Sequence, residues 1–553
     1  MLKRSIGVLA LSAAFLAGCG NGNNVTDSGN NGDTTNNATE ENLSNSVAME
    51  NFRVGDTFRA NEPIDVSMIF RQLPTSPFND EWMMVQRLRE ITNVYLDVTA
   101  VMHEDFETQR NLLIGAGDAP EIMPFAWAGH ETQFIAGGTL LPISDYFEHM
   151  PHFMHFVEEW GLEEPIENLR QADGNIYLLP GLQQDPRVRF SVAMRQDILD
   201  ELGLDAPDSW EEIRDVLRVV AEERPDITPY NDRWNLDATL NIAASTWGIG
   251  AGWGFGSGLH LNHNTNEFEY VAQMDELKDF VMFWNSLIEE GLLHPESLTQ
   301  GCGPAWEAFV NGESFMIAAG NTLEEYIRDF DANIEAGATH LEGYELVQLP
   351  VPNGPTGKIG EQLIDNGMML NASLRDREDF VAILQFIDWL WYSEEGREFA
   401  MWGIEGETFQ WNEEGYRELL SGFQHRGHGL NINPDYDDIQ VDHGFMENVW
   451  ALAGGSSRDL MTSVMTEEAR ALHIYNADTR VLRPITPRIP WTDLELEQIS
   501  IIQSALADHT RSNMSLFILG QRSMDDWDTF VQEIESMGSQ RFVDMANEAW
   551  SRR

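Results

Sequence analysis

The chain has 553 residues, of which 91 are acidic and 34 are basic, and its formal net charge is −57. A surface with so few cations cannot neutralise phosphates, so nucleic acid is excluded as a natural partner. The length exceeds what one hydrophobic core needs and predicts two or three domains.

The basic residues are unusual in kind. Lysine occurs only at positions 3, 278 and 358, and every other basic residue is arginine. Arginine keeps its charge at a pH where lysine titrates. An acidic, lysine-poor surface also suits high salt, which screens its self-repulsion. We therefore expect an alkaliphilic or halophilic host. A protein that needs no salt and loses stability above about pH 9 would contradict this hypothesis.

The first residues read as an export signal. Lys3 and Arg4 precede an apolar run over 6–16 that is too short to span a bilayer. Leu16-Ala17-Gly18-Cys19 then resembles a bacterial lipobox. We expect residues 1–18 to be a lipoprotein signal peptide, with Cys19 lipidated as the new N-terminus. An ordinary signal peptide is the alternative. Residues 19–61 are mostly polar and are predicted to form a disordered tether.

Strands and helices alternate after the tether. Apolar runs over 64–70, 94–101 and 121–124 are predicted strands, and helical patterns separate them. This order predicts βαβ units and a parallel sheet, so the fold class is α/β. Ligands of such sheets bind beyond the carboxyl ends of the strands, which places Trp127 and the loop to Glu131 at a candidate ligand edge.

The remaining chain predicts a second lobe. Residues 177–180 and 190–194 read as extended segments, with Pro186-Arg187 between them as a crossing. Ser209 and Glu212 form a capping box that opens a helix. Residues 344–350, followed by 367–371, look like a return to the first sheet. The predicted N-terminal lobe is therefore 62–185 plus 345–400, and the C-terminal lobe is 186–344 plus 401–553.

Six segments in order resemble family 1 extracellular solute-binding proteins, in particular their large lipoproteins from Gram-positive bacteria. They are Gly117 to Ile122 (GDAPEI), Asp173 to Pro180 (DGNIYLLP), Met194 to Leu204 (MRQDILDELGL), Ser209 to Glu212 (SWEE), Gly403 to Glu407 (GIEGE) and Trp527 to Trp550. The resemblance covers about residues 64–550. It implies a periplasmic-binding-protein-like fold, in which two α/β lobes joined by a hinge close on a ligand in the cleft.

The same resemblance implies a role in transport. Such a receptor is held by its lipid on the outer face of the cytoplasmic membrane and hands its ligand to the permeases of an ABC importer. It is a monomer and not an enzyme. Many relatives carry a calcium loop after the SWEE helix, but here residues 223–230 read ERPDITPY, without its ligand spacing. We therefore expect no calcium, no other metal and no cofactor. His149, His152 and His155 are expected to be solvated or packing residues.

An oligosaccharide is the expected ligand because sugars need flat aromatic surfaces and planar polar groups. The chain has 17 tryptophans. The candidate ligand-binding residues at predicted cleft positions are Trp127, Arg187, Arg195, Trp247, Trp253, Trp306 and Asn321. The alternative for each tryptophan is the core, and for each arginine an ion pair. Cys302 is expected to be a packing residue.

Three other functions remain open on the sequence alone. The first is a receptor for oligopeptides or another solute. The second is a surface enzyme that degrades polysaccharide, although no nucleophile elbow, zinc motif or phosphate loop is present. The third is a structural or adhesive lipoprotein of the cell envelope. Consumption of the ligand separates the enzyme from the receptors.

Overall fold

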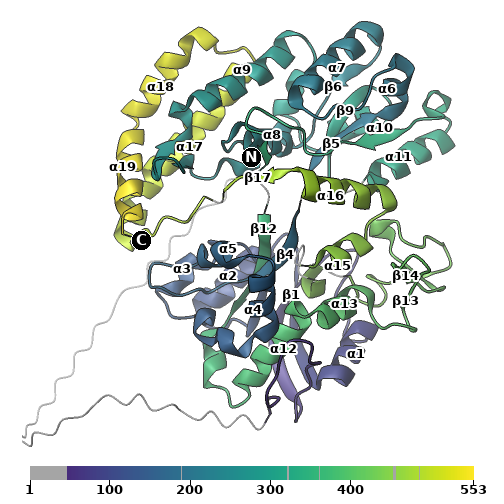
Figure 1. Ribbon diagram of the computed structural model, residues 1–553, viewed down its shortest axis with the longest axis vertical. Helices are drawn as coiled ribbons and strands as arrows, with labels where there is room; N and C mark the ends of the chain where they lie inside the picture. Colours follow the sequence, from purple (N-terminus) through teal and green to yellow (C-terminus); the bar gives the residue numbers. More distant parts are fainter. Residues whose placement is uncertain are drawn as a thin grey trace, which may run out of the picture. The chain divides into compact units, whose positions relative to one another are not determined.

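The computed structural model describes residues 47–187, 190–320, 323–359, 362–446, 448–451, 456–484 and 486–552. Within these ranges there are two large hydrophobic cores, and each surrounds its own mixed sheet with helices packed outside it (Figure 1). The predicted α/β class and the presence of two lobes are confirmed.

The first sheet has the strand order β2-β1-β3-β12-β4. Its strands are β1 (Ile64–Gln72), β2 (Val94–Met102), β3 (Ile122–Ala126), β4 (Leu179–Arg187) and β12 (Gln362–Leu370). β1 runs parallel to β2 and β3, as expected, whereas β12 is antiparallel to both β3 and β4. Trp127 directly follows the last residue of β3, so it lies beyond the carboxyl end of this strand, where ligands of such sheets bind.

Helices around the first sheet complete the first core. The principal ones are α1 (Met83–Thr92), α2 (Phe106–Ala116), α3 (Thr132–Ile135), α4 (Pro151–Glu159), α5 (Glu163–Glu167), α12 (Phe380–Tyr392), α13 (Glu394–Trp402) and α15 (Arg458–Ser463). Every residue of α12 is buried, because this helix is apolar on all sides and lies inside the lobe. Its one carboxylate, Asp388, accepts hydrogen bonds from the ring of His152 and from the backbone of Phe153.

The second sheet has the order β10-β5-β9-β6. Its strands are β5 (Ser191–Arg195), β6 (Thr228–Tyr230), β9 (Ser314–Ala319) and β10 (Leu346–Gln348). The helices of this lobe are α6 (Gln196–Leu202), α7 (Trp210–Glu223), α8 (Asp237–Trp247), α9 (Asp275–Glu289), α10 (Gly303–Val310), α11 (Glu324–Glu335), α17 (Asp493–Ile518), α18 (Trp527–Ser536) and α19 (Ser539–Trp550). α17 contacts α9, α18 and α19, and these helices are drawn together in Figure 1.

The cores differ from the expected lobe limits in three places. Residues 346–348 pair antiparallel with β5 in the second sheet and do not return to the first. Leu419, Ile439 and Trp450 are buried in the first core, although residues beyond 400 were expected in the second lobe. The expected tether also ends earlier, because Phe58 is buried in the first core. Long-range packing, which local patterns do not encode, decides all three.

Three described segments connect the lobes, two through strands and one through a helix. β4 leads into β5, β11 (Lys358–Ile359) precedes β12, and α16 (Glu467–Thr479) leads from α15 to β17 (Val481–Leu482), which pairs with β11. No helix in the described part of the chain is both long and apolar enough to cross a membrane.

Candidate ligand-binding site

A cavity of about 810 Å³ is lined by residues of both cores, and we call it the aromatic cavity. Its size lies in the range of small-molecule sites. The first lobe contributes Trp127, Gln183 and Asp365, while Phe190 and Trp253 come from the second lobe. The walls combine large rings with a few amides and charged groups, a composition that suits a ligand with both apolar faces and hydroxyls.

Trp127 lies on a loop that two arginines hold in place. Phe125, the fourth residue of β3, has a φ of +57°, a left-handed conformation that a large side chain rarely adopts. The buried Arg110 donates from Nη1 to the carbonyl of Phe125 at 2.6 Å, and Arg71 lies 4.5 Å above the Phe125 ring. Burial lowers the pKa of Arg110. Backbone strain that its surroundings enforce is typical of ligand-contacting loops.

Trp253 belongs to an aromatic cluster on the second core. It is 48% exposed, and its ring lies 5.2 Å from that of Phe190 and 5.4 Å from that of Trp234. Phe190 and Trp234 are in edge contact at 5.6 Å. The rings of Phe190 and Trp234 therefore support the exposed ring of Trp253 and fix its orientation at the wall of the aromatic cavity.

Trp234, which is part of this cluster, is not among the residues that the sequence predicts to bind ligand. It opens a run of three residues, with Asn235 and Leu236, that all have positive φ values. The guanidinium carbon of Arg233 lies 3.7 Å from the centre of the Trp234 ring. The only local signal is the polar turn Asn231-Asp232-Arg233 before the ring, which marks a turn without revealing its handedness.

A buried carboxylate holds this strained turn. Asp232 is fully buried and accepts hydrogen bonds from the hydroxyls of Tyr230 and Thr239 at 2.6 Å, and from the backbone N–H groups of Ala318 and Arg233 at 2.9 and 2.8 Å. Burial raises the pKa of Asp232, and its hydrogen bonds oppose that rise. Through these hydrogen bonds, Asp232 connects the turn that precedes Trp234 to β6, α8 and β9.

The polar side of the aromatic cavity is also preorganised. Gln183 on β4 donates to Asp365 on β12 at 3.1 Å, and both side chains are buried. Arg483 donates to the carbonyl of Ile249 at 2.9 Å. Arg488 donates to Glu131 at 2.7 Å, which joins a segment of the second lobe to the loop that follows Trp127.

Three other candidate residues, Trp247, Trp306 and Arg195, lie outside the lining of this cavity. Trp247 is the last residue of α8 and packs 5.4 Å from Phe280 and 5.3 Å from Phe283 in the second core. Trp306 stacks on Tyr326 at 4.4 Å and donates to Asp329 at 2.8 Å.

Arg195 is buried and donates from Nε and Nη2 to Asp197 at 2.8 and 2.6 Å, so it forms the ion pair that was its alternative role. Arg187 ends β4, and its side chain is outside the described part of the structure. Cys19 and Asn321 also lie outside the described residues.

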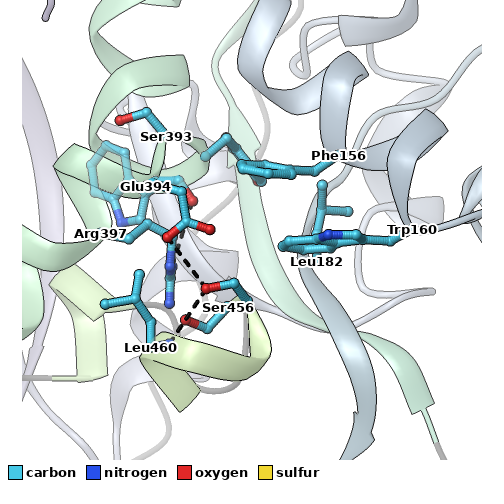
Figure 2. Close-up of a pocket in the computed structure, with 11 residues that line it drawn as sticks. Phe156, Trp160, Leu182, Ser393, Glu394, Arg397, Ser456 and Leu460 are labelled. Atoms are coloured by element: carbon cyan, nitrogen blue, oxygen red, sulfur yellow. Dashed lines mark hydrogen bonds between the residues drawn. The ribbon is translucent and has the colours of Figure 1, made fainter. Parts of the chain in front are cut away.

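A second, much smaller pocket adjoins β4 and the start of α13. Figure 2 shows Glu394, Arg397 and Ser456 on one side, and Phe156, Trp160 and Leu182 on the other. Its volume of about 10 Å³ has room for one water molecule at most and excludes a sugar. Burial lowers the pKa of Arg397 to about 10. The pocket is therefore a packing feature of the first lobe.

The segment 223–230 and the histidines at 149, 152 and 155, for which no metal is expected, pair with neighbouring charged side chains. Beyond α7, Arg224 bonds to Asp226 at 3.1 Å and to Glu201 at 2.9 Å, where calcium-binding relatives carry their loop. His152 bonds to Asp388, while His149 and His155 pair with Glu148 and Glu159. Among the described residues, no group of three or more His, Cys, Asp or Glu is placed to hold a metal ion.

Comparisons with known proteins give relatives of one kind. No protein-family model matches the chain. It is 25% identical over 325 residues to the fructooligosaccharide ABC transporter substrate-binding protein FusA of Streptococcus pneumoniae. The aligned region covers 55% of this chain and only 56% of FusA. It is 20% identical over 476 residues to the polygalacturonan/rhamnogalacturonan-binding protein YtcQ of Bacillus subtilis, covering 84% of this chain and 87% of YtcQ.

Solved structures share the fold. An extracellular solute-binding protein from Bifidobacterium longum subsp. infantis superposes with a TM-score of 0.63 at 14% identity, covering 89% of this chain and 98% of the other. Its two-lobe architecture matches the two cores described above. The chain is therefore similar in sequence to ABC transporter substrate-binding proteins, and it shares the fold of a solved extracellular solute-binding protein.

Proposed function

We propose that the protein is an extracellular, lipid-anchored receptor of an ABC importer, which binds an oligosaccharide in the aromatic cavity and delivers it to membrane permeases. The observation that carries the proposal is the placement of Trp127 and Trp253, from different lobes, in the wall of one cavity of about 810 Å³. Rings on both lobes can cover the apolar faces of a sugar when the lobes close.

The relatives support the same ligand class. FusA is named for fructooligosaccharides and YtcQ for polygalacturonan and rhamnogalacturonan, so both names specify carbohydrates. The proposed receptor acts without chemical change of its ligand and works as a monomer. Cys19 is the proposed lipidation site, and it holds the protein on the outer face of the cytoplasmic membrane.

The test is calorimetric titration of the purified full chain with fructo-oligosaccharides, oligogalacturonides and mixed oligopeptides, followed by chromatography of the recovered ligand. Saturable binding of a sugar that is recovered intact supports the proposal. Binding of peptides alone would favour a peptide receptor, and shortened sugars would identify an enzyme.

The anchor needs a separate measurement. Mass spectrometry of the N-terminal peptide from the native membrane should show a lipid-modified Cys19 as the first residue. In the Cys19→Ser variant, the protein should no longer be retained at the membrane. An unmodified N-terminus beyond residue 19 would contradict lipidation and leave sugar binding untouched.

A further inference from the structure

A second large cavity, of about 750 Å³, lies against the first. One of its walls is the segment 486–491, which we call the strap, and we call the space the strap cavity. Four residues line both it and the aromatic cavity: Ala128, Asn168, Thr486 and Arg488. Because the same side chains bound both spaces, the two cavities are neighbouring compartments on either side of these residues.

The strap is fastened to the first lobe by hydrogen bonds. The backbone N–H of Arg488 donates to Oδ1 of Asn168 at 2.8 Å, and Nδ2 of Asn168 donates to the carbonyl of Thr486 at 3.3 Å. The Arg488 guanidinium reaches Glu131 at 2.7 Å, and the Glu131 side chain is fully buried. These contacts fix the position of the strap between the two cavities.

The strap cavity has an aromatic wall on the second lobe. Trp491 is half-buried and stacks on Phe542, with ring centres 6.4 Å apart and planes 11° apart. Phe268 and Leu259 continue this wall. A tryptophan ring that is backed by a parallel ring and still lines a cavity offers a flat apolar face to a ligand.

The opposite wall, on the first lobe, is polar. Arg170 donates to Glu167 from Nε and Nη2 at 2.6 and 2.8 Å and to the carbonyl of Gly174 at 2.6 Å, which holds its plane in place. Gln171 and Asp173 line the same side. Planar charged and amide groups that face an aromatic wall form the same combination that the aromatic cavity presents, and it suits the hydroxyls and C–H faces of a sugar.

We propose that the strap cavity is a second compartment of the ligand site, which takes further sugar units of an oligosaccharide whose first units occupy the aromatic cavity. The inference rests on the proposed function and deepens it, because it specifies an extended ligand that passes the strap. The affinity should then rise with chain length once a ligand is long enough to reach Trp491.

The experiment titrates the full chain with size-graded fructo-oligosaccharides and oligogalacturonides, from two units upward. In the series that binds, we expect the longest members to bind about tenfold more tightly than the shortest. Trp491→Ala should remove this gain in affinity with length. Ala136→Trp, which fills the strap cavity from an exposed position on the other lobe, should remove it independently of any change in strap packing.

The matched control is Ala336→Trp, because Ala336 is equally exposed at the end of α11 and lines neither cavity. It should keep the wild-type dependence on length. The inference is overturned if short members bind and length adds nothing, or if both cavity variants keep the full gain. If no member of either series binds, the proposed function fails and the inference fails with it.

Discussion

Arg488, which is partly exposed, joins the strap to the first lobe by an ion pair with the fully buried carboxylate of Glu131. Nη1 of Arg488 lies 2.7 Å from Oε1 of Glu131, and the same carboxylate accepts hydrogen bonds from Gln171 at 2.6 Å and from the backbone of Gly129 at 2.7 Å. Glu131 thus connects the strap to the loop that carries Trp127. A charge in this position depends on its partners, because it has no access to water.

Replacing Arg488 should therefore destabilise the protein. Arg488→Gln leaves the Glu131 carboxylate buried without its cation, and we expect a loss of about 2 kcal/mol in the free energy of unfolding. Adding Glu131→Gln should recover part of that loss, which denaturant titration of the single and double variants would reveal. Arg552→Gln, at an exposed pair with Glu495, is the control and should change stability by about 0.5 kcal/mol or less. Equal losses for both arginines would contradict the role of the buried contact.

The tryptophans should separate into binding and packing residues. Trp127→Ala and Trp253→Ala should each weaken oligosaccharide binding about thirtyfold, because each removes a ring from the cavity wall. Trp306→Phe should leave affinity unchanged, since Trp306 stacks on Tyr326 outside the cavity. Calorimetry on the three variants checks this. Loss of binding in Trp306→Phe with retention in Trp253→Ala would reverse the assignment.

Local patterns predicted much of the fold. The helix expected after Ser209 is α7, and the Ser209 hydroxyl accepts a hydrogen bond from the Glu212 N–H at 3.2 Å. The first three strands and their parallel direction also follow from the sequence. The sequence does not predict that residues 346–348 belong to the second sheet. Their place there depends on pairing with β5, about 150 residues earlier in the chain.

The site was predictable only in part. Trp127 follows a strand, and this position was enough to place it at a sheet edge. Trp247 was assigned to a glycine-rich loop, but α8 extends through it and Gly248 ends the helix with a φ of +81°, so its ring faces the core. Trp234 depends on three consecutive left-handed residues, and no composition rule predicts these without glycine.

Acid should destabilise the protein through Asp185 on β4. Burial of Asp185 favours its neutral form, but the His473 ring 3.4 Å away and the hydrogen bonds from Arg458 outweigh burial and lower the pKa of Asp185. Because the folded pKa lies below the unfolded one, this carboxylate stabilises the fold above about pH 4 and loses that contribution as the pH falls through the lowered pKa. The free energy of unfolding should therefore decrease from about pH 5 to pH 3.

Asp185→Asn should flatten this pH dependence, since the amide cannot titrate. Asp215→Asn is the control, because Asp215 forms an exposed pair with Arg218. Urea titrations over the acid range would measure both variants. An unchanged slope in Asp185→Asn would exclude Asp185 as a source of the acid sensitivity.

Gly252 should be essential for the position of Trp253. It has a φ of +52°, and a Cβ atom there would lie 2.1 Å from the carbonyl oxygen of Asp237. Gly203, at the end of α6, has a φ of +66° and a ψ of +36°, and no atom lies within 4 Å of such a Cβ. Gly203→Ala should therefore cost only the left-handed backbone conformation, about 1–2 kcal/mol. Gly252→Ala adds a collision with backbone and should cost at least about 3 kcal/mol in the free energy of unfolding. Denaturant titration of the two variants measures the effect of the collision, because both substitutions place a side chain at a positive φ. Equal losses in the free energy of unfolding would show that the loop can move away from α8.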